Sequence, residues 1–289
     1  MLKILYIGSS GPLSFIPLQT LLDSGQTVSA IALEADSKSA LADQRIPVMA
    51  GNAGSIALLA RLHNIPVIKL SGLWSQSLDE IGRFSPDIIV VSCFARKLPD
   101  PVLSIPRIGC FNLHPSLLPA YRGPVPLFWQ FRAGVKEFGI TLHRISSQLD
   151  AGNIVAQTLV AMPDGVSAQR ASVLLAEAGS ELLVQTLSNV RRTELTGSPQ
   201  VEAYASYQGF PSPSDYRVSV TWTAQRLYNF ICATCDRGVR YPCRLGSRVY
   251  WLLGVDSWQE AGDNGAMIKG NTITIPCSRG FVTARFQAD

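Results

Sequence analysis

The sequence predicts an α/β protein with two parts: an N-terminal domain on a mainly parallel β-sheet and a small C-terminal β-barrel. Over roughly the first 135 residues, apolar runs of strand length alternate with amphipathic helical stretches, which is typical of βαβ units. Near the C-terminal end, several short apolar stretches are separated by turn residues instead. This second pattern is typical of a small barrel.

The N-terminal part begins with an apolar strand at residues 3–8 that ends in a Gly-Ser turn. The most apolar strand is expected at residues 87–93. Ligands of parallel sheets bind beyond the carboxyl ends of the strands, so the loops that follow these strands are the places to search for a site. The remaining elements of this part are strands at 27–33, 65–70 and 109–114 and helices at 17–24 and 55–63.

After residue 135 the pattern changes. Residues 138–144 and 154–162 flank a Gly-containing turn and predict an antiparallel pair, and residues 167–189 predict a long helix. We therefore expect a large domain over residues 1–192, a linker over 193–216 and a small domain over 217–289. The small domain is expected to hold a helix at 223–235 and strands at 249–255, 266–268, 272–275 and 281–286.

Composition excludes several classes of protein. With 47% hydrophobic and 16% charged residues among 289, the chain is globular rather than disordered. No apolar run approaches the roughly 20 residues that span a bilayer, and no signal-peptide pattern is present, so we expect a cytoplasmic protein without membrane contact. Its six cysteines are then expected to be reduced thiols. The net charge of +4 is modest, and most of the excess lies beyond residue 205.

The most unusual segment surrounds the end of the strand at 109–114. Asn112 and His114 lie two residues apart, so their side chains project from one face of that strand. Downstream, Asp150 occupies a tight turn that contains Gly152. Each residue alone has an ordinary explanation, as a turn cap, a structural histidine or a turn former. Their combination points to a catalytic group.

Residues 112–123 read Asn-Leu-His-Pro-Ser-Leu-Leu-Pro-Ala-Tyr-Arg-Gly, and residues 149–152 read Leu-Asp-Ala-Gly. These strings resemble the two signature motifs of the folate-dependent formyltransferases, and the resemblance covers roughly residues 1–190. It implies a Rossmann-like catalytic domain at 1–192 and an OB-like barrel at 217–289. It also implies transfer of a formyl group from 10-formyltetrahydrofolate to an amine.

The resemblance implies a role for each catalytic residue. Asn112 would donate an N–H to the oxyanion that forms when the amine attacks the formyl carbon. His114 would stabilise that oxyanion or move a proton, because an imidazole changes charge near neutral pH. Asp150 would orient His114 and hold a water for proton transfer. No metal and no covalent intermediate are required. Ser116 lacks the Gly-x-Ser-x-Gly setting of a nucleophile.

Further residues are expected to bind the folate and the acceptor. Arg122 is a candidate anion contact, with a solvated surface arginine as the alternative. Trp129 is a candidate for the acceptor side, with core packing as the alternative. Residues 94–98 resemble the family's loop beside the pterin, and Leu149 would form the opposite wall. The expected folate contacts are Phe94, Ala95, Arg96, Lys97, Leu98, Ser116 and Leu149.

The acceptor is left open between charged initiator tRNA and a small amine or amino sugar nucleotide. The region beyond residue 205 is similar in layout to the barrel of methionyl-tRNA formyltransferases, but shorter. Their tRNA-contacting loop early in the chain corresponds to Ala35–Arg45, where only Lys38 and Arg45 supply positive charge. A folate-binding module without turnover and a hydrolase are further alternatives, and DNA is not expected as a partner.

The C-terminal part also contains a group of cysteines and a group of arginines. Cys232, Cys235, Cys243 and Cys277 do not form the usual double pair of a zinc site, because Cys243 and Cys277 are not a close pair and the first two lie in an expected helix. Four arginines fall within twelve residues and are either a solvated rim or a patch that binds RNA phosphates. They are Arg237, Arg240, Arg244 and Arg248.

Overall fold

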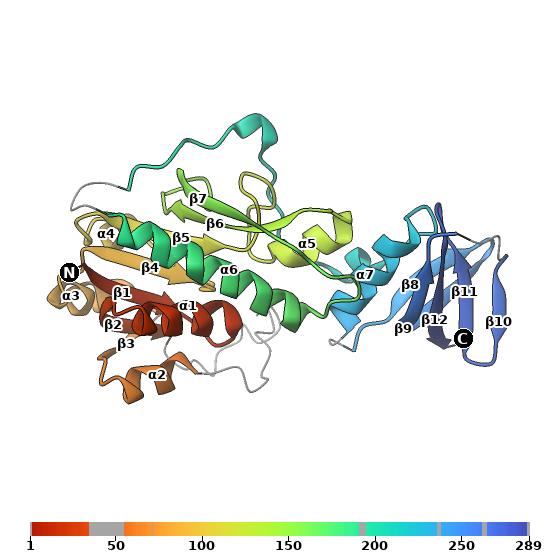
Figure 1. The fold of residues 1–289 in the computed structure, drawn as a ribbon, viewed down its shortest axis with the longest axis horizontal. Coiled ribbons are helices and arrows are strands. Elements are labelled where there is room, and N and C mark those ends of the chain that lie inside the picture. Colours follow the sequence, from red (N-terminus) through yellow and green to blue (C-terminus); the bar gives the residue numbers. More distant parts are fainter. Residues whose placement is uncertain are drawn as a thin grey trace. The chain divides into compact units, whose positions relative to one another are not determined.

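The computed structural model describes residues 2–34, 55–70, 72–190, 195–235, 238–261 and 265–287. They divide into two compact units that interleave along the sequence (Figure 1). Unit 1 consists of Met1–Pro124, Phe138–Val160 and Ser172–Gln208. Unit 2 consists of Val125–Glu137, Ala161–Ala171 and Gly209–Asp289. The chain therefore enters unit 2 twice before its C-terminal region, an arrangement that the sequence did not indicate.

Unit 1 is built on a seven-stranded sheet with strand order β3-β2-β1-β4-β5-β6-β7. The first five strands of this order are parallel, and β6 and β7 are antiparallel to their neighbours. This confirms the expected mainly parallel sheet. The strands are β1 (Lys3–Gly8), β2 (Thr27–Glu34), β3 (Val67–Leu70), β4 (Ile88–Ser92), β5 (Gly109–His114), β6 (Phe138–Arg144) and β7 (Ile154–Val160).

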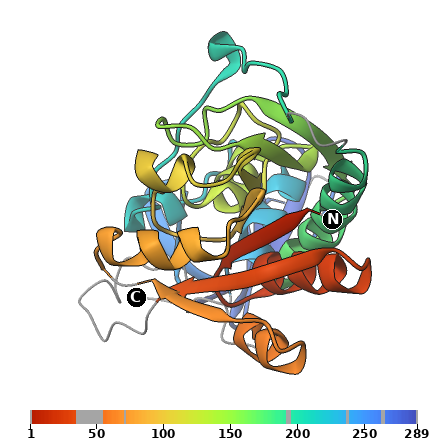
Figure 2. The same ribbon diagram turned by 90° about the vertical axis from the view of Figure 1, so that its left-hand side faces the viewer.

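Helices cover both faces of the unit 1 sheet (Figure 2). Helices α1 and α6 lie on one side, and α3 and α4 lie on the other. Because both faces are covered, the central strands are mostly apolar, and all five residues of β4 are buried. The helices are α1 (Pro12–Asp23), α2 (Ile56–Leu62), α3 (Ser75–Arg83), α4 (Asp100–Leu103) and α6 (Ala168–Ser188).

Unit 2 contains a five-stranded antiparallel sheet with order β10-β11-β12-β9-β8, and helix α7 packs against β9 and β12. This agrees with the expected small barrel-like domain. The side chain of Thr223 caps α7 by accepting the N–H of Arg226. The elements are α5 (Pro126–Ala133), α7 (Ala224–Thr234), β8 (Tyr241–Leu245), β9 (Arg248–Gln259), β10 (Met267–Lys269), β11 (Thr272–Pro276) and β12 (Phe281–Gln287).

Strand β8 was missed in the sequence, and its composition explains why. Pro242 and Arg244 interrupt its apolar residues, and a proline within a run argues against a strand. β8 lies at the end of the strand order, where a missing N–H costs a sheet little. The edge position therefore permits a sequence that would be unfavourable in the middle of the sheet.

The segment expected to be a linker is partly built into unit 1. Ser198 and Ile154 exchange both backbone hydrogen bonds at 2.8 Å, and the Arg122 N–H donates to the carbonyl of Ser206 at 2.8 Å. A Cβ on Gly123 would lie 2.1 Å from the Gln208 carbonyl oxygen, so only glycine permits this approach. The described residues from 195 to 208 thus lie beside β7 and beside residues 115–123 of the first motif, which we call the motif loop. Residues 209–216 belong to unit 2.

Within the described residues, no helix is long and apolar enough to cross a membrane.

Candidate active site

Strand β5 positions the two motif residues at the place where the sheet changes from parallel to antiparallel. Asn112 lies opposite Val91 of β4 on one side and opposite His143 of β6 on the other. The loop after β4 and the loop after β5 leave the sheet from the same edge. The backbone thus brings the expected folate loop and the catalytic motif to one end of unit 1.

His114 is held in one orientation. Its side chain is only 4% exposed, and its Nε2 lies 2.9 Å from the Tyr121 carbonyl oxygen. A carbonyl oxygen only accepts, so Nε2 carries the hydrogen in the neutral ring. Nδ1 faces Oδ1 of Asp150 at 3.7 Å. Nδ1, the ring nitrogen without a hydrogen in the neutral ring, is therefore the one that faces the carboxylate.

Asp150 is fixed by the motif loop. Its backbone is left-handed, with φ of 52°, and the Gly123 N–H donates to its Oδ2 at 2.9 Å. A Cβ on Gly152 would lie 1.8 Å from the Arg144 carbonyl oxygen, so this turn can approach β6 only with glycine there. The two signature motifs thus meet through the hydrogen bond from Gly123 to Asp150, while Gly152 lets the second motif lie against β6.

His143 completes the polar cluster. It is 1% exposed, its Nδ1 lies 3.0 Å from the Arg144 carbonyl oxygen, and its Nε2 lies 3.2 Å from Nδ2 of Asn112. Burial, together with the charge of nearby His114, lowers the pKa of His143 to about 4, against an opposing effect of Asp150. The ring is therefore neutral at pH 7, with its hydrogen on Nδ1.

The neutral His143 sets the direction of the Asn112 amide. Because Nε2 of His143 accepts, the group of Asn112 that faces it must be the NH2. Nε2 of His143 also lies 3.7 Å from Oδ1 of Asp150, but two acceptors do not form an ion pair, so we assign this contact no attraction. Asn112 has a second amide hydrogen, which none of the described residues accepts.

Two of these residues were missed in the sequence. His143 lies 31 residues from Asn112 in the sequence, and only the β5–β6 register places it beside Asn112. Gln200 lies in the expected linker, yet its Nε2 donates to the carbonyls of Asp150 and Gly152 at 2.8 Å each. The alternation within residues 138–144 gives a weak signal for His143, and no local signal marks Gln200.

Arg122 lies at the same loop but its guanidinium is already engaged. It donates to Oε1 of Gln200 at 2.8 Å and, in a bidentate pair, to the carboxylate of Glu202 at 2.7 and 3.1 Å. Arg122 is 8% exposed. Its contact with an acceptor stays a prediction, because a ligand anion would have to compete with Glu202.

The expected folate loop follows β4. Phe94 packs edge-on against Trp74 at 6.2 Å, and the Arg96 guanidinium lies 4.6 Å from the centre of the same Trp74 ring. Leu98 is buried in the core, whereas Ala95 and Lys97 are exposed. The loop thus presents a half-buried aromatic and cationic surface at the end of β4, with Leu98 anchoring it.

The remaining expected site residues have the following places. Leu149 is exposed beside Asp150. Ser116 is fully buried and its hydroxyl donates to the Ala120 carbonyl at 2.8 Å, within the motif loop. Trp129 belongs to unit 2, where its indole N–H donates to the Gly209 carbonyl at 2.8 Å. Their contacts with ligands stay predictions.

Parts of the expected RNA-binding regions lie outside the described residues. The segment Ala35–Arg45 and Arg237 lie outside the described residues. In the described part of the chain, no group of three or more His, Cys, Asp or Glu residues is placed to hold a metal ion.

Three comparisons with known proteins bear on this site. Residues 71–187 match the family described as formyl transferase. The methionyl-tRNA formyltransferase of Halalkalibacterium halodurans is 30% identical over 262 residues, which are 89% of this chain and 80% of that protein.

Among solved structures, the chain is similar to an N-formyltransferase from Helicobacter canadensis, in complex with folinic acid and dTDP-3-aminofucose. The TM-score is 0.70 at 17% identity, and both chains are covered completely. HypX from Aquifex aeolicus, in complex with tetrahydrofolic acid, gives a TM-score of 0.61 at 17% identity over 98% of this chain. The chain spans 43% of that longer protein.

Proposed function

Because the chain belongs to the formyltransferase family, we propose that Asn112, His114 and Asp150 transfer a formyl group from 10-formyltetrahydrofolate to an amine. One observation carries this assignment. A buried carboxylate faces the proton-exchanging nitrogen of a fixed histidine, beside an asparagine whose amide direction is set by a second, neutral histidine. When bound, the folate supplies an activated one-carbon acyl group at its N10.

The free amide hydrogen of Asn112 is suited to an oxyanion. When the amine nitrogen bonds to the formyl carbon, the formyl oxygen gains negative charge. His143 holds one N–H of Asn112 in place, so the second is already aimed before charge develops. Donors that need no reorganisation are worth about 3 to 4 kcal/mol each in acyl transfer.

His114 and Asp150 are suited to the proton. The attacking amine must lose a proton, and the departing folate nitrogen must gain one. Nδ1 of His114 is free to take and return this proton, because Nε2 is committed to the Tyr121 carbonyl. The Asp150 carboxylate lies 3.7 Å from this nitrogen. At that separation one bridging water would also fit the geometry of proton relay.

The residues around the catalytic edge are compatible with a folate. An aromatic and cationic surface formed by Phe94, Arg96 and Trp74 follows β4, and the exposed Leu149 flanks Asp150. A pterin needs flat apolar contact, and its glutamate tail needs a cation. These residues supply both kinds of contact on the edge that holds Asn112 and His114.

For the acceptor, we propose methionyl-tRNA first. Curated relatives at about 30% identity carry that name, and 80% of the Halalkalibacterium relative is covered. The C-terminal region also holds an excess of positive charge, with nine Lys and Arg against six Asp and Glu after residue 204.

An amino sugar nucleotide is the second candidate. It is favoured by the sequence of Ala35–Arg45, which contains only two cations where tRNA-specific members carry an arginine-rich loop. The chain also matches the fold of the Helicobacter enzyme over the full length of both chains, and that structure holds dTDP-3-aminofucose.

One assay separates these readings. The full chain is incubated with 10-formyltetrahydrofolate and, separately, with methionyl-tRNA, an amino sugar nucleotide, a panel of small amines or water alone. Release of tetrahydrofolate is followed by absorbance. Release that depends on methionyl-tRNA supports the first candidate, and release only with the sugar replaces it with the second. Equal release in water indicates a hydrolase, and no release with any acceptor rejects catalysis.

We also propose a cytoplasmic location. None of the six cysteines is in a disulfide in the structure, which is compatible with a reducing compartment.

A further inference from the structure

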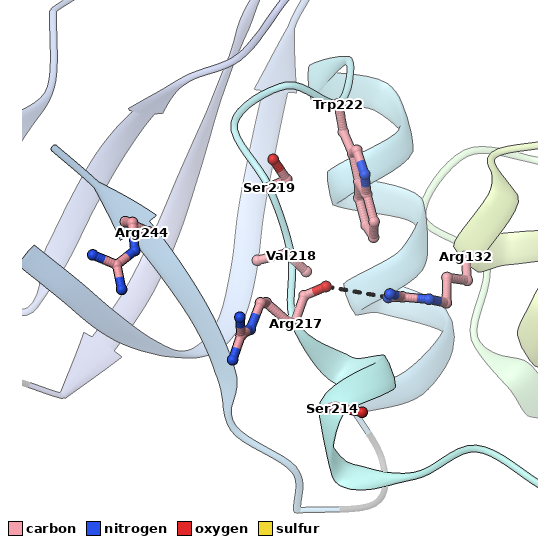
Figure 3. A pocket seen from close by; sticks show the side chains of 7 residues that line it. All are labelled: Arg132, Ser214, Arg217, Val218, Ser219, Trp222 and Arg244. Atoms are coloured by element: carbon pink, nitrogen blue, oxygen red, sulfur yellow. Dashed lines mark hydrogen bonds between the residues drawn. The ribbon is translucent and has the colours of Figure 1, made fainter.

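Unit 2 contains a cavity of about 490 Å³ that the formyl-transfer chemistry does not use (Figure 3). Every residue that lines it belongs to unit 2. Three of its side chains are arginines, two are serines and one is a tryptophan. These are Arg132, Arg217, Arg244, Ser214, Ser219 and Trp222.

The backbone places two of the arginines on one face. Val218 pairs with Cys243 in a parallel bridge at the edge of β8, and both side chains are buried, at 2% and 0% exposure. Side chains alternate along extended backbone, so Arg217 and Arg244 project from the opposite, exposed face. Figure 3 shows both guanidinium groups on the same side of the 217–222 segment.

The cavity is positively charged and has no carboxylate in its lining. Among the described residues, neither Arg217 nor Arg244 forms an ion pair. The nearest acid in sequence, Asp215, directs its carboxylate to the backbone N–H and hydroxyl of Ser212. Neighbouring guanidinium groups repel each other unless an anion lies between them. An anion in this cavity would relieve that repulsion.

The rest of the wall is held firmly. Arg132 donates to the backbone carbonyls of Asp215 and Arg217, the second at 3.1 Å. The Arg226 guanidinium lies 4.0 Å from the centre of the Trp222 ring and donates to the Arg132 carbonyl at 2.8 Å. Because these side chains are already ordered, a ligand would lose little binding energy in ordering them.

We propose that this cavity binds a small phosphate-bearing ligand of the size of a nucleoside diphosphate. Arginine guanidinium groups match phosphate oxygens in bidentate pairs, and serine hydroxyls add neutral donors. Ligand cavities commonly measure about 300 to 1,000 Å³, so this one accommodates both phosphates and an attached ring. The inference is independent of formyl transfer, because no catalytic residue lines the cavity.

The test is calorimetric titration of the full chain with ADP, with inorganic pyrophosphate and with adenosine as separate arms. We expect ADP and pyrophosphate to bind, ADP more tightly, and both to weaken as salt is added. Adenosine alone is expected not to bind. Arg217→Ala and Arg244→Ala should each weaken ADP about tenfold, since each removes a charged hydrogen bond.

Arg248→Ala is the matched control, because it removes the same charge from an exposed position of the neighbouring β9 outside the cavity. It should leave the affinity for ADP within about twofold. Equal weakening by the control would show a diffuse charge effect and overturn the proposal. So would the absence of ADP and pyrophosphate binding. An RNA hairpin that binds through Arg217 and Arg244 while ADP does not would also overturn it, in favour of RNA contact.

Discussion

The catalytic edge of unit 1 and the arginine cavity of unit 2 both gather ionisable side chains. These side chains are buried and paired at the catalytic edge, whereas Arg217 and Arg244 in the cavity are exposed. At the catalytic edge, His114, His143 and Asp150 are at most 9% exposed and each is held by a backbone or side-chain partner. In the cavity, Arg217 and Arg244 are exposed and have no acidic partner among the described residues. Buried, mutually satisfied groups are suited to chemistry on a developing charge, whereas exposed cations are suited to binding a charge that already exists.

The largest expected effect comes from removing the proton-exchanging ring. His114→Ala should lower the rate of formyl transfer by about a hundredfold to ten-thousandfold, as loss of general acid–base catalysis does. Binding of 10-formyltetrahydrofolate should stay within a few-fold, because the substitution removes no part of the expected folate loop. Single-turnover kinetics and fluorescence titration measure the two quantities.

His63→Ala is the control for this substitution, since His63 is exposed and lies away from the site. Full transfer activity in His114→Ala would remove His114 from the mechanism.

The next effect concerns the oxyanion donor. Asn112→Ala should lower kcat by about a hundredfold to a thousandfold with little change in KM, because the lost hydrogen bond forms in the transition state. Asn153→Ala removes an amide that donates to the Thr196 carbonyl instead, and it should keep near-normal kcat. A variant of Asn112 that raises KM alone would assign this residue to ground-state binding.

A smaller effect tests the support of the Asp150 turn. Gln200→Ala removes two hydrogen bonds to the carbonyls of Asp150 and Gly152, and transfer should fall about tenfold. Glu202→Gln, which alters the exposed partner of Arg122, should change transfer by less than about twofold. If both variants behave alike, the turn does not depend on Gln200.

The smallest effect is on stability. Burial lowers the pKa of folded His143 to about 4, and in the unfolded chain the pKa is about 6.5. Between these values the unfolded chain takes up a proton that the folded protein does not, so the free energy of unfolding falls as pH drops through this window. His143→Gln should lessen the difference in unfolding free energy between pH 7 and pH 5 by on the order of 1 kcal/mol.

Urea unfolding at the two pH values measures this difference, with His63→Gln as the control. An unchanged pH dependence in His143→Gln would mean that folding does not lower the pKa of His143.

Much of this protein could be read from local patterns. The period-two alternation at residues 109–114 put Asn112 and His114 on one face, and β5 indeed carries both. The apolar run at 87–93 predicted the buried centre of the sheet, and β4 occupies it. The predictions failed where a distant contact overrode the local pattern, as in edge strand β8 and in residues 198–208, which pair with β7 and with the motif loop.

The sequence by itself determined the fold class, most of the strands and the three catalytic candidates, because apolar periodicity and short motifs act over neighbouring residues. Only the tertiary structure decided that His143 directs Asn112, that Gln200 supports the Asp150 turn, and that Arg217 and Arg244 share a cavity. These partners are separated by 27 to 50 residues along the chain. A buried polar group needs some partner, but the sheet register and chain path select which one.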